Sequence, residues 1–473
     1  MDNPGLVWLM SLAHGFNEFF SIIVPPLFPF LVPGLDISYA DASLMVVVFF
    51  VTYSVFQLPI GRLVGVYSSR MLLAVGMVGL SVSIALVAFA PSFPLMLVGM
   101  AVAGVGGSTY HPTGMSVISD LESADTHGRS MGIHGMLGTF GSMAAPIVVA
   151  GVAVSYGWRT ALLVGSALGL AFGVALYLLY PRIAPSPPPS TGFVAAVRAE
   201  FGRDSVGQVR RALGFVRSPT VLGLSLLFVV IGGEVRAVQT FTPVFASELV
   251  GDDPAFGNAM LSLTMVAAGV ASTVAGYWVD RFDRRVFAAG CFLLTAGVVA
   301  VLALVPLDRL LLPVAFVVLG VAMYSIYPAA NAITAGASTE ELSGSIFAVT
   351  QTAAAIGGAG GPFLLGVVAD VASLEIAFLT TAGIAVFGVA VVALASDEFA
   401  CRGRTGPLLE AVVRTVELAD ALSSAGGSLG TFWRPNERRS NTRTVVTPKS
   451  RTLLFSVMTE RHIERRWDRG RRD

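Results

Sequence analysis

The residues of this chain best suited to chemistry lie in its first apolar stretch, residues 6–32. His14 and Glu18 are four residues apart, and serines stand three residues outside the pair on each side, so that all four share one helical face. Glu18 falls about 12 residues into the stretch, or ~18 Å at 1.5 Å per residue, near the middle of a ~30 Å hydrocarbon core. A carboxyl group at that depth can load and release a proton near neutral pH. We therefore predict that His14, Asn17 and Glu18 couple protons or contact substrate. The alternative is a structural carboxyl group bonded to a neighbouring helix.

Two later apolar stretches contain further charged or titratable groups. Arg236 and Gln239 lie within residues 219–246, and His111 directly precedes Pro112. Because arginine stays charged, something anionic has to balance Arg236, either within its own lobe or across a cavity. Proline frees a carbonyl one turn earlier, so an imidazole beside that break could bind substrate or relay protons. A packed histidine at a kink is the alternative.

Uncharged polar side chains in other apolar stretches are candidate cavity contacts, although each could equally face a neighbouring helix. They are Tyr110, Tyr324, Tyr327, Asn331 and Gln351.

Glycine recurs every third residue from 132 to 141, which predicts the close approach of a second helix.

The composition indicates the elements that position these groups. Of the 473 residues, 54% are hydrophobic and 13% are charged, against about 25% charged in soluble domains. The mean hydropathy is +0.75. We therefore predict an all-α polytopic membrane protein with twelve transmembrane helices. The apolar runs are 6–32, 41–66, 71–90, 94–118, 129–154, 158–180, 219–246, 256–279, 286–305, 310–335, 343–369 and 374–396.

The loops predict the orientation and the domain organisation. Basic residues gather in the loops on the side of the two termini, which places both termini in the cytoplasm of a cell-membrane protein. We expect one six-helix half at residues 1–180 and the other at 219–396, joined by a Pro- and Arg-rich cytoplasmic linker at 181–218. Residues 397–473 carry 15 of the 30 Lys and Arg residues and are predicted to form a basic, largely disordered tail.

An internal repeat relates the two halves. A shift of 216 residues superimposes glycines and prolines in the fourth and fifth spans on their counterparts in the tenth and eleventh. These pairs are Gly104 with Gly320, Pro112 with Pro328, Gly141 with Gly357, and Pro146 with Pro362. A shift of 218 residues pairs Pro25 with Pro243, and Glu18 with Arg236. Six-helix halves related along the membrane normal are typical of two-lobed transporters.

With its Gly-x-x-x-Asp-Arg-x-x-Arg-Arg loop, the chain resembles the major facilitator superfamily over about residues 1–396. His14-Gly-Phe-Asn17-Glu18 and Tyr110-His111-Pro112 resemble the fosmidomycin-resistance branch of exporters. The resemblance implies that the first and seventh spans line one cavity, and the repeat then predicts that Glu18 faces Arg236, as an ion pair or across an anion. It also implies a cytoplasmic gate, although the loop arginines could merely enforce topology. The gate residues are Gly276, Asp280, Arg281, Arg284 and Arg285.

These observations predict a secondary transporter of a small organic molecule that works by alternating access, most simply a proton-coupled exporter. The alternatives are proton-coupled uptake of an organic anion and a transporter-like membrane sensor. No G-x-x-x-x-G-K-[ST] motif and no catalytic constellation is present in the sequence, so we expect neither an enzyme nor a built-in ATP motor. The expected partners are substrate, protons and membrane lipids. We expect a monomer without cofactor, metal or nucleic acid.

Overall fold

The computed structural model describes residues 1–64, 66–184, 195, 197, 218–279, 281–337 and 343–394. All of them belong to one compact unit, Met1–Arg414. Within these ranges the chain is helical, apart from turns and one isolated bridge between Val64 and Tyr67.

The first half of the chain forms six membrane-spanning stretches. Its elements are α1 (Pro4–Ser21), the 3-10 helix η1 (Pro25–Leu27), α2 (Phe28–Leu35), α3 (Tyr39–Leu63), α4 (Ser69–Phe89), α5 (Phe93–Gly107), α6 (Tyr110–Leu121) and α7 (Ala124–Ile183). At 60 residues, α7 would extend for ~90 Å, three times the thickness of a bilayer core. It bends at Gly157, whose φ of 80° is left-handed and favours glycine, so α7 contributes two spans.

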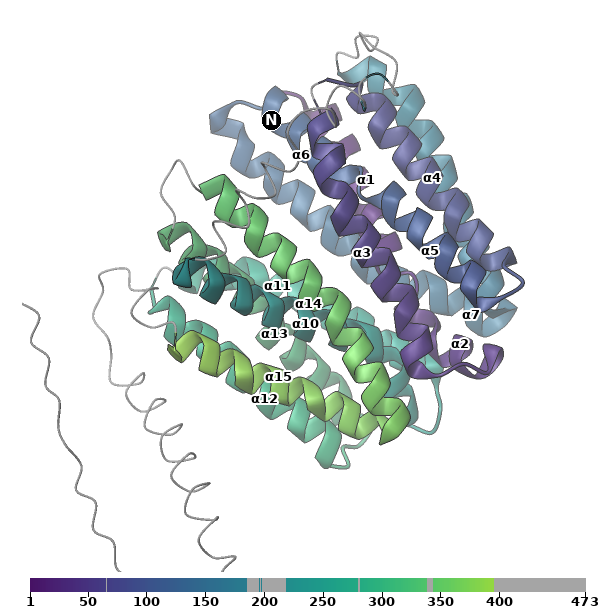
Figure 1. Ribbon diagram of the computed structural model, residues 1–473, viewed down its shortest axis with the longest axis vertical. Helices are drawn as coiled ribbons and strands as arrows, with labels where there is room; N and C mark the ends of the chain where they lie inside the picture. Colours follow the sequence, from purple (N-terminus) through teal and green to yellow (C-terminus); the bar gives the residue numbers. More distant parts are fainter. Residues whose placement is uncertain are drawn as a thin grey trace, which may run out of the picture. The chain divides into compact units, whose positions relative to one another are not determined.

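The second half contributes six more long apolar helices. They are α10 (Pro219–Glu248), α11 (Pro254–Val279), α12 (Arg284–Leu304), α13 (Leu311–Ala337), α14 (Ser343–Val371) and α15 (Leu374–Leu394). The described ranges thus contain 11 helical stretches that are long and apolar enough to cross a membrane. With α7 counted as two spans, the predicted all-α fold with twelve spans is confirmed. Figure 1 shows the two groups next to each other, purple to blue and teal to yellow-green.

Capping residues and prolines fix where the helices begin and break. Ser38 and Asp41 form a reciprocal capping box at the start of α3, and Asp283 accepts hydrogen bonds from two amides that open α12. The fourth span breaks into α5 and α6 at Ser108, four residues before Pro112, as the missing proline donor predicts. The same effect divides the first span before Pro25.

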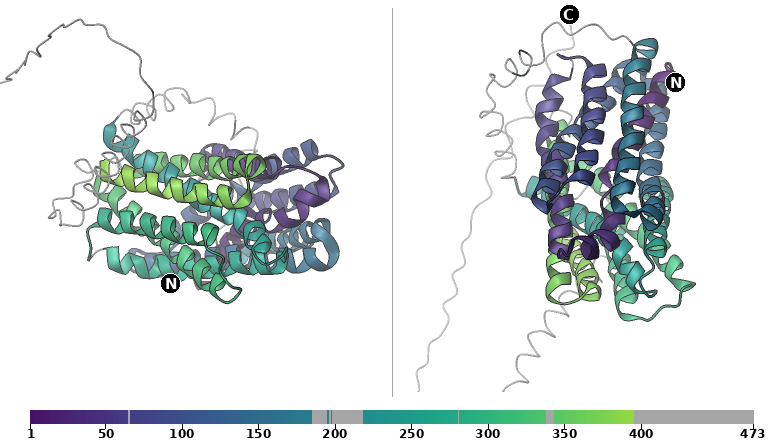
Figure 2. Two further views of the ribbon diagram at one scale, coloured as in Figure 1. Left: turned by 90° about the horizontal axis from the view of Figure 1, so that it is seen from below. Right: turned by 90° about the vertical axis from the view of Figure 1, so that its right-hand side faces the viewer.

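The two halves meet through specific helix pairs. Helix α3 packs against α14, and α7 packs against α11. Figure 2 shows the purple to blue helices of the first half beside the teal to yellow-green helices of the second half. We name the end of the bundle that carries Arg62 and Arg129 the basic end, and the end that carries Asp36 and Asp370 the opposite end.

Hydrogen bonds join the halves at the opposite end. Asp370 accepts hydrogen bonds from the amides of Tyr39 (2.8 Å) and Ala40 (2.9 Å), at the start of α3. Asn258 of α11 donates to the carbonyl oxygen of Pro26 at 3.1 Å. These bonds cross from one half to the other, so the halves are closed together at the opposite end.

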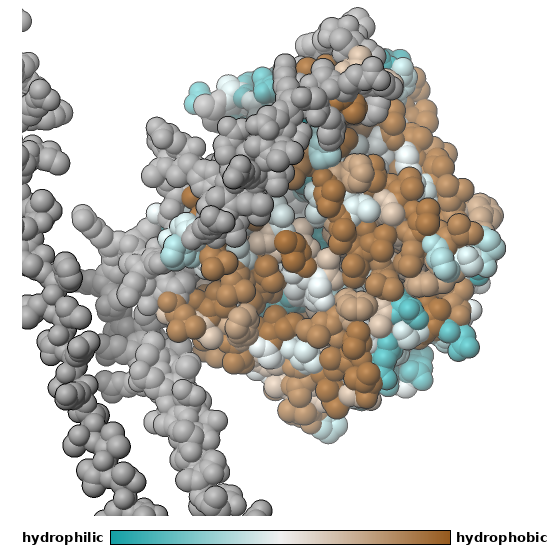
Figure 3. All heavy atoms as spheres, in the orientation of Figure 1, coloured by the Kyte–Doolittle hydropathy of each residue, from teal (hydrophilic) through white to brown (hydrophobic). Residues whose placement is uncertain are grey.

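The outer surface of the helices is apolar. Side chains such as Phe89 and Val270 are 71% and 62% exposed. Figure 3 shows hydrophobic residues over most of the visible face, with hydrophilic ones gathered toward its ends. Large exposed apolar surface suits contact with lipid.

Several of the sequence predictions concern residues that the structure does not describe. Most of the linker at 181–218, the loop residue Asp280 and the tail at 397–473 lie outside the described residues. The domain boundaries that the sequence suggests stay predictions.

Candidate functional site

A cluster of one carboxyl group and two imidazoles lies on the first and fourth spans. Nε2 of His111 is 3.4 Å from Oε1 of Glu18, and Nε2 of His14 is 3.7 Å from the same oxygen. The second oxygen, Oε2, accepts hydrogen bonds from Ser21 (3.2 Å) and Ser142 (3.5 Å). The break before Pro112 and the i, i+4 spacing on α1 bring these groups together. The predicted grouping of His14 with Glu18 therefore also includes His111.

Hydrogen-bonding partners fix the state of the first imidazole. Nδ1 of His14 lies 2.9 Å from the backbone oxygen of His134. A carbonyl oxygen only accepts, so Nδ1 carries the hydrogen, and Nε2 faces Glu18. An unprotonated Nε2 and an ionised carboxylate would repel each other. A single proton between Nε2 and Oε1 removes that repulsion.

His134, for which the sequence suggested no function, supports this arrangement. Its ring stacks on that of His14 with centroids 4.1 Å apart. Tyr110 donates its hydroxyl hydrogen to the carbonyl of Met10, so it accepts from Nε2 of His134, 2.9 Å away. Three of the chain's five histidines thus converge. His111 and His134 both lie about one hundred residues or more from His14 in the sequence, a separation that no local pattern reveals.

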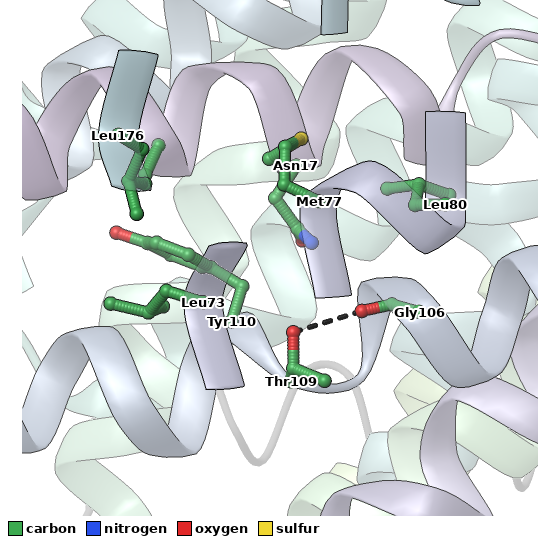
Figure 4. A pocket seen from close by; sticks show the side chains of 9 residues that line it. Asn17, Leu73, Met77, Leu80, Gly106, Thr109, Tyr110 and Leu176 are labelled. Carbon is green, nitrogen blue, oxygen red and sulfur yellow. Dashed lines mark hydrogen bonds between the residues drawn. The ribbon is translucent and has the colours of Figure 1, made fainter. Parts of the chain in front are cut away.

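Asn17 and Tyr110 point away from the Glu18 oxygens. Asn17 is 2% exposed; its amide donates to the carbonyl of Gly107 and accepts from the Tyr53 hydroxyl, both at 2.9 Å. Figure 4 shows Asn17 and Tyr110 around one small space between the helices, with Thr109 bonded to Gly106 nearby. This space measures about 10 Å³, roughly one water molecule, so it is no substrate site.

Glu18 faces a cavity of about 240 Å³ that both halves line. From the second half, Arg236 and Gln239 of α10 and Tyr324 and Tyr327 of α13 form its wall. Arg236 donates to Gln239 at 2.9 Å, and Gln239 donates to Tyr324. The prediction that Glu18 and Arg236 belong to one site agrees with this cavity. They form no direct ion pair, because no carboxylate oxygen of the described residues lies within 4.0 Å of Arg236.

A second cavity of about 800 Å³ lies between α7 and α11, toward the basic end. Helices α7 and α11 touch where Gly269 faces Thr139. A Cβ added at Gly269 would come within 2.5 Å of the Thr139 side chain. Nothing lies within 4 Å of a Cβ built on Gly132 or Gly135, and both line the cavity. The close packing predicted from the glycine repeat holds at Gly141, where a Cβ would lie 1.9 Å from the oxygen of Gly15.

Other predicted residues lie elsewhere. Asn331 and Gln351 are exposed and line neither of these cavities. In the predicted gate, Arg284 donates to the carbonyl of Ala332 on α13 at 2.9 Å. Arg281 stacks over Tyr277.

The same cluster bears on the question of metal binding. Within the described ranges, His14, Glu18 and His111 are the set whose potential ligand atoms all lie within 4.8 Å of one another. The two nitrogens lie 3.4 Å and 3.7 Å from one carboxylate oxygen, longer than an ordinary N–H···O hydrogen bond. These residue types suit a metal ion as well as a proton.

A second carboxylate, that of Glu122, connects two helices at the basic end. Glu122, between α6 and α7, accepts hydrogen bonds from the Asn3 amide (2.8 Å), Ser130 (2.7 Å) and Thr126 (2.8 Å). Burial raises the pKa of Glu122, but these hydrogen bonds outweigh it and lower the pKa to about 2. The ionised carboxylate therefore ties the start of α1 to α7.

Comparison with known proteins places this geometry in context. The sequence profile of the Major Facilitator Superfamily matches residues 7–256 and 237–404. The Fosmidomycin resistance protein of Escherichia coli K12 is 26% identical over 153 residues, which cover 32% of this chain and 37% of that protein. The match thus spans little more than a third of that relative. Multidrug resistance protein MdtG of Escherichia coli O1:K1 is 24% identical over 396 residues, covering 81% of this chain and 91% of that protein.

A solved structure shows the same fold. A bacterial homologue of the human lysosomal transporter Spinster, in an inward-facing and occupied conformation, superimposes with a TM-score of 0.70. The superposition covers 85% of this chain and 98% of the other, at 14% identity. At that identity the likeness concerns the fold alone.

Proposed function

Because this chain belongs to the Major Facilitator Superfamily, as its sequence motifs predict, we propose that it transports a small organic molecule in exchange for protons bound at Glu18. Membership makes it a multi-pass membrane transport protein. The coupling ion, the direction and the orientation in the cell membrane belong to the proposal, as does the monomeric state.

The observation that carries the proposal is the convergence of two imidazoles on one oxygen of Glu18. The Glu18 side chain is 20% exposed and borders the cavity that both halves line. A proton can therefore reach Glu18 from the same space that a substrate would enter. A shared cavity lets proton binding and substrate binding change each other's affinity directly, which is a coupling free energy between the two.

Two protonation states follow from the hydrogen bonds. In the loaded state, one proton is shared between Oε1 of Glu18 and an Nε2 atom of His14 or His111. In the empty state this proton has left to the solvent, so Glu18 is ionised and both imidazoles are neutral. A substrate that draws a proton or a charge from this cluster shifts the balance between the two states.

The closed opposite end and the cavities toward the basic end support alternating access. Asp370 and Asn258 bond across the halves at one end, and the larger cavity opens toward the other. We propose that rocking the halves breaks the first set of contacts and closes the second region. With the basic end in the cytoplasm, this conformation faces inward.

Export is the direction that the names of the two resistance-type relatives favour. Uptake of an organic anion is the second candidate, and Arg236 in the cavity wall favours it. Substrate flux measured with a pH gradient imposed in each direction across the vesicle membrane distinguishes export from uptake.

The test is proton flux into proteoliposomes that contain a trapped pH dye, challenged with hydrophobic drugs, phosphonates and carboxylates. We expect a compound-dependent pH change that Glu18→Gln abolishes. Glu234→Gln is the matched control, because Glu234 is a carboxyl group on α10 that is 2% exposed and lines none of the cavities described above. Labelled-compound flux without any proton movement would contradict the proposal. A chelator present throughout excludes metal-driven signals.

A further inference from the structure

We propose that the substrate is an amphiphile whose single anionic group binds at Arg236 and whose apolar body lies in the groove between α7 and α11. This inference rests on the proposed function, because it names the substrate class of the same cavity. It goes further because it assigns the anionic group and the apolar body of the substrate to separate parts of the protein.

The anionic end follows from the charges in the smaller cavity. Arg236 stacks over Phe50 at 4.1 Å and donates to the uncharged Gln239. Glu18 is the carboxyl group that lines this cavity, and four side chains already engage its two oxygens. The guanidinium is permanently charged and sits within a membrane-spanning helix, where an unbalanced charge is costly. A bound anion supplies the missing balance.

The apolar end follows from the lining of the larger cavity. Its walls consist mainly of aliphatic, methionine and aromatic side chains, with glycine at two positions of α7. They include Met136, Phe140, Val266, Val270 and Val274. Met136 and Val270 are 45% and 62% exposed, so within the part of the chain that the structure describes this groove lies open to lipid or to a ligand. Methionine adapts to varied shapes, which suits an alkyl or aryl body.

The two cavities adjoin each other. Gly135, Thr139, Ser142, Tyr324 and Tyr327 line both of them. One molecule can therefore place its charged group beside Arg236 and extend past Gly135 toward the basic end. A small hydrophilic anion would fill only the first part, and an apolar cation would meet Arg236 with the wrong charge.

Binding of alkyl sulfonates to the full-length protein in lipid nanodiscs tests this inference. Isothermal titration calorimetry compares methanesulfonate, butanesulfonate and octanesulfonate, with empty nanodiscs subtracted and octyltrimethylammonium as the cationic control. We expect octanesulfonate to bind at least tenfold more tightly than butanesulfonate. Four fully buried methylenes would give up to about 200-fold. The cation should bind at least tenfold more weakly than octanesulfonate.

Two variants test where the anionic end and the apolar end of the ligand bind. Arg236→Gln should weaken octanesulfonate binding about tenfold or more, since it removes a charged hydrogen-bond donor. Gly135→Leu should weaken octanesulfonate more than butanesulfonate, because it fills open space in the groove. The matched controls are Arg159→Gln and Gly151→Leu. Arg159 stacks on Trp158, and a Cβ at Gly151 also meets nothing within 4 Å.

Several results would overturn the inference. They are equal binding of the octyl cation, no gain from butyl to octyl in the wild type, or unchanged affinity in Arg236→Gln. The chain-length series needs no variant, so misfolding cannot obscure it. If other compounds drive proton flux while octanesulfonate does not bind, the substrate class alone is wrong. If octanesulfonate binds as expected but no compound moves protons, proton coupling is wrong and the binding site stands.

Discussion

Replacing Asp370 with asparagine is expected to shift the protein away from the conformation that is closed at the opposite end. Asp370 of α14 accepts the amides of Tyr39 and Ala40, the first two residues of α3 in the other half. Ser38 accepts the next free amide, that of Asp41, within its own half. Separation of the halves therefore removes Asp370 from the positive end of a helix while leaving the Ser38 cap in place.

The magnitude follows from the two bonds and their exposure. Loss of an N-terminal cap costs about 0.5–2 kcal/mol, and an exposed charge at a helix N-terminus contributes roughly 0.3–1 kcal/mol. Asparagine keeps one acceptor oxygen and loses the charge, so we expect a change of about 1–2 kcal/mol. Such a change raises the population of the opened state roughly 5- to 30-fold.

Thiol accessibility measures this population. Ser43 is fully buried on α3, close to Gly366 of α14, so a cysteine at position 43 reacts with a hydrophilic maleimide only when the halves part. In a background where Cys291 and Cys401 are alanine, the labelling rate should rise 5- to 30-fold with Asp370→Asn.

Asp308→Asn is the control, because Asp308 accepts the amides of Leu310 (2.9 Å) and Leu311 (2.8 Å) within one half. It should leave the labelling rate unchanged. Equal rates in wild type and Asp370→Asn would refute the assignment of this contact to the closing of the halves.

Four further substitutions test the packing and the polar networks through thermal unfolding in nanodiscs. Gly141→Ala should destabilise the protein by about 1–3 kcal/mol through overpacking, whereas Gly135→Ala on the same helix should be neutral or slightly stabilising; equal effects would contradict the assigned helix contacts. Tyr53→Phe should cost about 1–3 kcal/mol, because it removes the donor to the buried Asn17 oxygen, and an unchanged melting temperature would argue against that bond. The pKa of Glu122 is lowered to about 2 from 4.5, so its stabilisation is complete above about pH 4.5 and is lost as the pH falls toward 2. The difference in melting temperature between wild type and Glu122→Gln should shrink over that range, and a constant difference would contradict the sign.

Local sequence patterns predicted the spans and the first part of the site because both depend on neighbouring residues. Apolar runs set the length of each helix, and Pro112 sets the break that separates α5 from α6. The spacing of His14 and Glu18 on one helix face is a property of the helix itself. The repeat brought Glu18 and Arg236 into one prediction, because symmetric halves present equivalent positions to one cavity.

The remaining features depend on contacts between distant segments. His134 contacts His14 across 120 residues, and nothing in its own neighbourhood distinguishes it. The glycines of α7 share one spacing, yet Gly141 meets a backbone while Gly135 faces open space. Asn17 lies one residue from Glu18, and the helical rotation of about 100° per residue directs it to Tyr53 instead.

Net transport and exchange in Glu18→Gln proteoliposomes, measured side by side, test the central claim most directly. A labelled substrate found in the compound panel is followed under an imposed pH gradient, and then as exchange against unlabelled substrate without a gradient. We predict that Glu18→Gln loses accumulation driven by the pH gradient and retains exchange, because the cavity persists while the proton site is gone. Accumulation at the wild-type level in Glu18→Gln would contradict the assignment of proton coupling to Glu18.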